Sequence, residues 1–246
     1  PYIQFLVVTV FVLVAIYALR SSRKSEQNMV WVGLTKETAH QLGTPISSLM
    51  AWVEVLRETY PNDTLIPEMG RDVTRLQLIA ERFSKIGSMP ELKRTDLAQV
   101  VQHVVDYIKC RTSNKVEISA DLPEGEMLVP MCAPLFEWVI ENLCKNAIDS
   151  MEGKGVITIS VERKDKHVYI DITDTGKGID RRNFKRIFQP GYTSKQRGWG
   201  LGLSLAQRII EDYHRGKLFV KQSQLGVGTT FRIELAVESG EETKDS

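Results

Sequence analysis

Asn142 and Asn146 are a pair of residues whose types and spacing suit a metal ion. They lie four residues apart, so a helix would place both side chains on one face. Neutral amide oxygens on one face suit Mg²⁺, which takes few protein ligands and keeps waters and phosphate oxygens. The pair is equally consistent with polar residues on the exposed side of a helix.

Two glycine-rich segments follow along the chain. Asp174 opens a turn with Gly176 and Gly178, where bare backbone admits a flat ligand and the carboxylate can accept the exocyclic amine of adenine. The run Gly198–Leu203 precedes a predicted helix, whose N-terminus and exposed N–H groups favour phosphate. Each segment alone is weak, because Asp-Gly turns end many strands and this glycine run does not follow a strand, as a dinucleotide motif would.

His40 differs from the other histidines of the chain. It is predicted to lie outside the apolar seam of its helix, with its ring facing water. Pro45, inside the same predicted helix, removes one hydrogen bond and crowds the carbonyl of residue 41, so the helix is expected to flex beside His40. His103, His167 and His214 are predicted to be surface residues without a chemical role.

Two heptad patterns are expected to position His40. Apolar residues recur at spacings of four and three, first at Leu42, Ile46, Leu49, Val53 and Leu56, and then at Met69, Val73, Leu76, Ala80 and Phe83. Residues 60–63 form a predicted turn, with Asp63 or Thr64 as the N-cap of the second helix. Each stripe is too narrow to form a core alone, so two hairpins are expected to pair into a four-helix bundle as a homodimer.

The pattern changes after Pro90. Short alternating segments predict five strands, at Val116–Ala120, Val156–Val161, Val168–Thr173, Lys217–Lys221 and Thr230–Leu235. They alternate with helical stretches at Asp96–Arg111, Pro134–Met151 and Leu203–His214. Helices on one side of a mixed sheet predict an α/β sandwich, which makes the chain α+β as a whole.

The N-terminal residues predict a membrane anchor. Tyr2–Leu19 carries no charge, and eighteen residues at ~1.5 Å each give a helix of ~27 Å, close to the ~30 Å hydrocarbon core. Arg20, Arg23 and Lys24 follow, which by the positive-inside rule places the rest of the chain in the cytoplasm. A signal peptide, the alternative, carries its positive charge before the apolar run. Because the chain begins with Pro1, we expect an upstream sensing region outside this sequence.

These patterns predict four segments. They are a transmembrane helix over 1–19, a juxtamembrane segment and dimerisation hairpin over 20–90, a domain with the candidate nucleotide site over 91–237 and a flexible tail over 238–246. The net charge of +1 gives no case for nucleic-acid binding. The three cysteines, without a CxxC pair, are expected to be buried reduced thiols, with a zinc or redox site as the alternative.

In this order, the Asn-rich helix, the Asp-x-Gly-x-Gly turn and the glycine run resemble the N, G1 and G2 boxes of the Bergerat-type ATPases, over residues 92–237. The resemblance implies that Asn146 binds Mg²⁺ with the help of Asn142, and that Asp174 reads the adenine of ATP. It also implies that Thr229 holds an adenine-side water and that Lys195 faces phosphate. The implied phosphate-proximal lid hinge comprises Gly198, Gly200 and Gly202, and Leu201 within this run is a further expected nucleotide-binding residue. Gly191 stands where the family often has a second aromatic residue, which puts the packing of the lid in question.

The segment around His40 resembles the H box of bacterial two-component sensor histidine kinases. That resemblance implies autophosphorylation of His40 from Mg·ATP, followed by transfer to an aspartate of a separate response regulator at the inner membrane. Thr44 would position water for a phosphatase reaction. Gln41 departs from the usual acidic residue and cannot accept a proton near neutral pH, so the proton goes to water or ATP, or the reaction is slower.

Two other hypotheses remain. A Bergerat ATPase of the chaperone or mismatch-repair type would have no use for a membrane span or an H-box hairpin. A degenerate sensor that binds ATP without transferring phosphate is supported only by Gln41 and Gly191.

Overall fold

The structure is a computed structural model that describes residues 2, 4, 9, 11, 12, 41–86, 90–193 and 200–237. It divides into two compact units, residues 1–89 and 90–246, which we describe separately. His40 and most of the predicted membrane segment lie outside the described residues. Within the described ranges, no helix is long and apolar enough to cross a bilayer.

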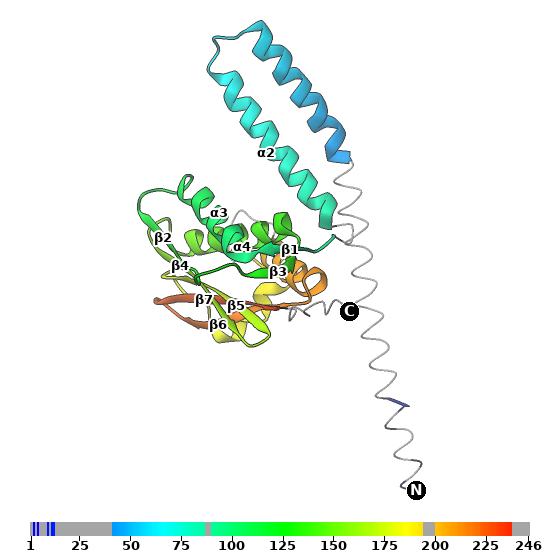
Figure 1. Cartoon of the computed structure of the whole chain (residues 1–246), viewed down its shortest axis with the longest axis vertical. Coiled ribbons are helices and arrows are strands. Elements are labelled where there is room, and N and C mark those ends of the chain that lie inside the picture. Colours follow the sequence, from blue (N-terminus) through cyan, green and yellow to red (C-terminus); the bar gives the residue numbers. More distant parts are fainter. Residues whose placement is uncertain are drawn as a thin grey trace, which may run out of the picture. The chain divides into compact units, whose positions relative to one another are not determined.

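The first unit contains a helical hairpin (Figure 1). One helix covers residues 41–59 and continues through Pro45, and α2 (Leu65–Ile86) follows after a short turn. The carboxylate of Asp63 accepts a hydrogen bond of 2.8 Å from the N–H of Leu65, which satisfies a donor at the start of α2. The predicted turn and one of its two candidate capping residues are therefore confirmed.

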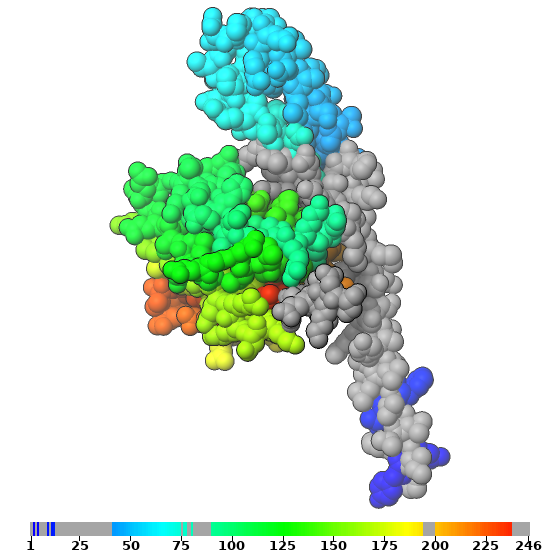
Figure 2. All heavy atoms as spheres, in the orientation of Figure 1, coloured from blue at the N-terminus to red at the C-terminus, as the bar shows by residue number. Residues whose placement is uncertain are grey.

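The apolar seam of the hairpin divides into two rows. One row is buried between the two helices, with Leu49 and Leu56 packed against it, and comprises Ile46, Val53, Ile66, Val73 and Ala80. The other row stays exposed, with exposed fractions of 42% for Leu42 and 47% each for Met69 and Leu76. Figure 2 shows described side chains of the two helices, in blue and cyan, lying against one another. One hairpin thus buries only part of each predicted seam.

The second unit is built on a five-stranded mixed sheet in the order β2-β4-β5-β7-β6. Its strands are β2 (Val116–Asp121), β4 (Gly155–Lys164), β5 (His167–Asp174), β6 (Lys217–Gln224) and β7 (Gly228–Ala236). The pairing of β2 with β4 is parallel and the other pairings are antiparallel. All five strands were predicted, because alternate residues on each are apolar.

A second sheet of two short strands was not predicted. It pairs β1 (Lys93–Asp96) with β3 (Leu128–Met131) in antiparallel register. Each strand has four residues, too few to give an alternating pattern. Asp96, the last residue of β1, also caps the next helix, because its carboxylate accepts from the N–H of Ala98.

Helices cover one face of the large sheet (Figure 1). They are α3 (Leu97–Lys109), α4 (Ala133–Ser150) and α5 (Gly202–Arg208), with short 3-10 turns at η1 (Arg181–Asn183) and η2 (Arg186–Phe188). Side chains on the central strands that are almost fully buried form the core against these helices, among them Ile170, Ile172, Ile233 and Leu235. The α/β sandwich is confirmed.

The third predicted helix, Leu203–His214, changes character halfway. Its first part is α5, and residues Ile209–Tyr213 (η3) form a π-helix. The wider turn carries His214 inward, where its ring meets the edge of Phe136 at 5.9 Å between centroids. The prediction that His214 lies at the surface is therefore wrong, since only 6% of it is exposed. The side chain of His103 is exposed as predicted, and that of His167 is partly exposed.

His214 connects this helix to α4. Its Nε2 atom accepts a hydrogen bond of 3.1 Å from the N–H of Cys132, the N-cap of α4, and its Nδ1 lies 2.8 Å from the carbonyl oxygen of Ile209. The ring must therefore be neutral, with its proton on Nδ1. Burial lowers the pKa of His214 and favours this state.

The cysteines only partly follow the prediction. All three are free, and Cys144 is buried, where desolvation and the nearby charge of Glu141 raise the pKa of its thiol to about 12. Cys110 is exposed because it stands at the C-cap of α3, beyond the buried face of that helix. No group of three or more metal-ligating side chains occurs in the described part of the chain.

His214 should make the stability of this unit depend on pH. Since burial lowers its pKa in the folded state, the unfolded state binds the extra proton first as pH falls. His214→Phe should cost about 1–3 kcal/mol at pH 8, because the N–H of Cys132 loses its acceptor. The stability advantage of the wild type over the variant should shrink below about pH 6.5. Thermal unfolding of both proteins across this range tests it, and a difference independent of pH would contradict it.

Candidate functional site

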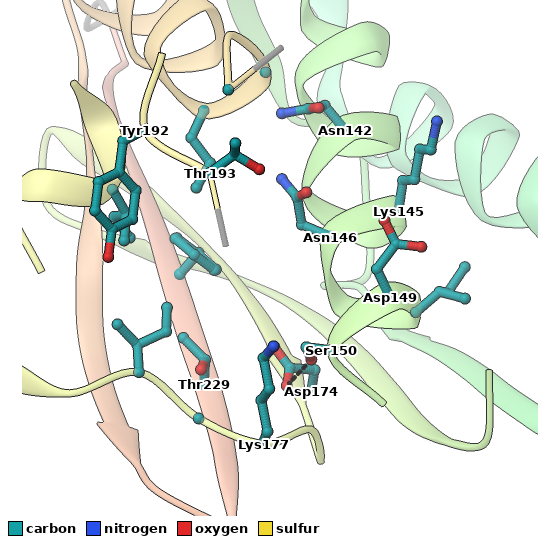
Figure 3. Close-up of a pocket in the computed structure, with 18 of the residues that line it drawn as sticks. Asn142, Lys145, Asn146, Asp149, Ser150, Asp174, Lys177, Tyr192, Thr193 and Thr229 are labelled. Atoms are coloured by element: carbon teal, nitrogen blue, oxygen red, sulfur yellow. Dashed lines mark hydrogen bonds between the residues drawn. The ribbon is translucent and has the colours of Figure 1, made fainter. Parts of the chain in front are cut away.

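A cavity of about 870 Å³ lies between α4, the loop after β5 and the start of α5 (Figure 3). It is lined by predicted site residues from separated segments of the chain: Asn142, Asn146, Asp174, Gly178, Gly200, Leu201, Gly202 and Thr229. Gly176 lies beside it, in the turn after Asp174. Two further predicted residues, Lys195 and Gly198, are outside the described ranges.

Gln41 and Thr44 belong to the first unit. Both are exposed on the helix of residues 41–59. Since the two units are described separately, their roles beside His40 remain predictions from the sequence.

At one end of the cavity stands the carboxylate of Asp174, the last residue of β5, with 4% of its surface exposed. Its Oδ1 atom accepts from the N–H of Gly176 at 2.8 Å and from the hydroxyl of Ser150 at 3.1 Å. Burial raises the pKa of Asp174, and hydrogen bonds from Gly176, Ser150 and the backbone of Thr229 offset part of that rise. Such a carboxylate can accept a hydrogen bond from an amino group of a ligand.

At the same end of the cavity as Asp174, Thr229 contributes a hydroxyl group to the wall. Thr229 is 4% exposed, and its Oγ1 lies 2.9 Å from the hydroxyl of Ser223. The Ser223 hydroxyl in turn accepts from the N–H of Ile179 at 2.8 Å, so the β6–β7 hairpin supports the loop after Asp174. Thr229 is thus placed where it can share a water or a ring nitrogen of the ligand.

Two asparagines point into the other end of the cavity from one face of α4 (Figure 3). The Nδ2 atom of Asn142 is buried and has no hydrogen-bond partner in the described part of the protein. A buried amide donor without a partner is costly, so this atom suits an acceptor supplied by a ligand, such as a phosphate oxygen.

The start of α5 lies directly against Asn142. A Cβ atom added to Gly202 would stand 2.5 Å from the Oδ1 of Asn142, so a side chain at this position would require Asn142 or the start of α5 to move. The resulting wall of backbone and amide groups fits phosphate, and Asn146 on the adjacent turn would hold Mg²⁺ through its oxygen. The residues present therefore fit a magnesium nucleotide.

The departure at Gly191 has a structural explanation. Its N–H donates to the carbonyl of Gly200 at 3.0 Å, which joins the two ends of the segment between them. Its φ of +82° is a conformation that side chains rarely adopt, and a Cβ on Gly200 would stand 2.5 Å from the carbonyl carbon of Gly191. An aromatic residue at position 191 would have to adopt this strained backbone conformation, although the space around its Cβ is open.

Some lining residues were missed by the sequence analysis. Ser150 and Lys177 line the base-side end, and Tyr192 and Thr193 line the phosphate side. Ser150 falls four residues after Asn146, on the same helix face, which was a usable signal. Lys177 lies inside the glycine turn that was singled out, but its position in the turn gave no indication of its direction.

Comparisons with known proteins agree with this geometry. Residues 133–239 match the family described as "Histidine kinase-, DNA gyrase B-, and HSP90-like ATPase". Sporulation kinase E of Bacillus subtilis (strain 168) is 28% identical over 90% of this chain and 31% of its own length. Sensor histidine kinase ZraS of Salmonella typhimurium is 30% identical over 89% of this chain and 49% of its own.

Over about nine tenths of its length the chain is similar in sequence to sensor histidine kinases. Among solved structures, the catalytic domain of histidine kinase ThkA is 26% identical over 60% of this chain and 96% of its own, with a TM-score of 0.55. ThkA in complex with response regulator protein TrrA matches 89% of this chain and 66% of its own at 23% identity and a TM-score of 0.57, which shows a likeness of fold alone. The chain spans less than half of the two curated relatives named above.

Gly202→Ala tests the phosphate end of the site. The added methyl group would meet Asn142 at 2.5 Å and displace its side chain or the start of α5. We expect affinity for Mg·ADP to fall at least about tenfold, the loss of roughly 1.4 kcal/mol of contacts, as measured by calorimetric titration.

Gly43→Ala is the matched control, because a Cβ at Gly43 meets nothing within 4 Å. It should bind Mg·ADP as the wild type does. Unchanged affinity in Gly202→Ala would contradict the assignment of this wall to phosphate.

Proposed function

We propose that this chain is a protein-histidine kinase that transfers the γ-phosphoryl group of Mg·ATP to His40. The observation that carries the proposal is the cavity with a buried acceptor carboxylate at one end and an unpartnered amide donor at the other. Asp174 and Asn142, which provide these groups, lie on separate elements of the fold. The match of residues 133–239 to the ATPase family and the similarity to kinases and a kinase catalytic domain support the same activity.

The residues of the site would divide the work between them. Asp174 accepts the amino group of adenine, and Thr229 supports the base beside it. Asn142 donates to a phosphate oxygen, while Asn146 holds the Mg²⁺ ion that neutralises charge on the phosphates. Binding the nucleotide at both ends fixes the γ-phosphorus for in-line attack.

His40 would act as the nucleophile. A neutral imidazole nitrogen forms the new bond to the γ-phosphorus as the bond to the bridging oxygen breaks, and ADP leaves. Loss of the proton on the other ring nitrogen then gives phosphohistidine with a neutral imidazole ring and a negatively charged phosphoryl group. Gln41 can orient the ring through its amide oxygen but cannot take that proton, so we propose that water or the nucleotide receives it.

The phosphoryl group would pass next to a response regulator. We propose an aspartate of a separate receiver domain as its acceptor, supported by the likeness of fold to a kinase solved in complex with a response regulator protein. We further propose that Thr44, which is exposed and four residues after His40 in the sequence, positions water for dephosphorylation of the regulator. We also propose that residues 1–19 anchor the chain in the lipid of a bacterial inner membrane, with the catalytic part in the cytoplasm.

The exposed apolar row of the hairpin supports a homodimer. Leu42, Met69 and Leu76 are each more than two-fifths exposed, at heptad positions that a second hairpin would cover. Leu76→Glu should therefore convert the dimer to monomers in sedimentation or light scattering. Glu58→Lys, an exposed polar position, should leave the dimer intact. A monomeric wild type would contradict the four-helix bundle.

Labelling with γ-³²P-ATP and Mg²⁺ tests the kinase activity. The wild type should gain label that is lost in acid and kept in base, as expected for phosphohistidine. His40→Gln should abolish the label, and Asn146→Ala should reduce it by at least about a hundredfold, because the metal loses its protein ligand.

His103→Gln is the control, since the side chain of His103 is 72% exposed and lies outside the cavity. It should label at the rate of the wild type. Label that persists in His40→Gln would contradict the acceptor assignment, and a wild type without any label would contradict the kinase proposal itself.

A further inference from the structure

Ser150, the last residue of α4, contacts the loop on the base side of the cavity twice. Its hydroxyl oxygen lies 3.1 Å from the Oδ1 of Asp174, as the dashed line in Figure 3 shows. Its backbone carbonyl accepts from the N–H of Lys177 at 3.1 Å. A single residue of α4 therefore holds both the carboxylate and the backbone of the turn that follows it.

The turn is shaped around this hydroxyl. A Cβ atom on Gly176 would stand 1.9 Å from the Oγ of Ser150 and 2.8 Å from the Oδ1 of Asp174. The space that a side chain at position 176 would need is thus occupied by the serine hydroxyl. The N–H of Gly176 donates to the same Oδ1 at 2.8 Å, so two donors converge on one carboxylate oxygen.

Two donors on one oxygen fix the plane of the carboxylate. The backbone of Thr229 also donates to this carboxylate, and the lone pairs that these donors leave free can accept from a ligand. The serine proton has a second acceptor, the carbonyl of Ala147 at 2.9 Å, but an ionised carboxylate is the stronger acceptor of the two. A hydroxyl that donates to the charged form favours that form, and an ionised carboxylate accepts hydrogen bonds without donating any.

We propose that Ser150 is a positioning residue that holds Asp174 as an oriented acceptor, so that the site selects a 6-aminopurine over a 6-oxopurine. Adenine presents an amino donor at this position, whereas hypoxanthine and guanine present an oxygen that an acceptor carboxylate repels. The inference rests on the proposed binding of ATP and adds the residue that sets its base specificity. Asp174 meets the base, and Ser150 acts through it.

Binding of ADP and of inosine diphosphate to the full-length chain tests the proposal. The two ligands carry the same sugar and phosphates. They differ at the 6-position, where inosine diphosphate has an oxygen in place of the amino group and therefore also a proton on N1. Ser150→Ala should weaken ADP binding about fivefold, the effect of one lost hydrogen bond, while the affinity for inosine diphosphate changes less than about twofold. In labelling with ATP, the KM should rise by a similar factor with kcat unchanged, because Ser150 is remote from the phosphates.

Two further variants separate the hydroxyl from its surroundings. Ser150→Thr keeps the hydroxyl and should retain the preference for ADP within about twofold of the wild type. Ser119→Ala removes an exposed hydroxyl on β2, outside the cavity, and should change neither affinity.

The outcomes distinguish this inference from the proposed function. Equal weakening of both ligands in Ser150→Ala would overturn it, because the serine would then support the fold of the site rather than its specificity. If Ser150→Thr also loses the preference for ADP over inosine diphosphate, the inference is overturned. The loss would then come from a change in the space beside Gly176 and not from the missing hydroxyl. Unchanged affinities in Ser150→Ala would also overturn it. A wild type that binds neither ligand would contradict the nucleotide site, and the inference with it.

Discussion

The geometry of the site depends on helix α4, which carries contacts for both ends of the ligand on one rigid element. Asn142 and Ser150 are eight residues apart, about 12 Å along a helix axis. That separation is set by helical geometry rather than by loops. Base-side and phosphate-side groups therefore keep a fixed distance when the ligand leaves.

The fold holds α4 along its length and at both ends. Its inner face is fully buried against the sheet, with Phe136, Ile140 and Leu143 without exposed surface. At its start, His214 accepts from the N–H of Cys132, and at its end the carbonyl of Ser150 accepts from Lys177. At Gly176 the loop after β5 lies directly against α4, and at Gly202 the start of α5 does so, because neither glycine has a side chain to keep them apart. The loop after β5 and the start of α5, which both line the cavity, are thus held against the same helix.

Much of this arrangement could be predicted from the sequence, for identifiable physical reasons. The strands of the large sheet alternate apolar residues, and the glycines around Asp174 and Gly202 mark places where side chains cannot fit. The π-turn at Ile209–Tyr213 could not be predicted, because its residues also fit a regular helix, and so the inward position of His214 was missed. The heptad pattern likewise gave the seam of the hairpin but not which of its rows one hairpin buries. Ser150 was missed because a serine at a helix end usually satisfies the backbone, and only the structure shows its hydroxyl on Asp174.

The central claim is that one helix spans the nucleotide from base to phosphate. A crystal structure of the chain with Mg²⁺ and a non-hydrolysable ATP analogue tests it most directly. We predict the adenine amine within hydrogen-bond distance of Asp174, a phosphate oxygen on the Nδ2 of Asn142, and the metal on the Oδ1 of Asn146. A nucleotide bound in the opposite direction, or bound outside the cavity beside α4, would contradict the account.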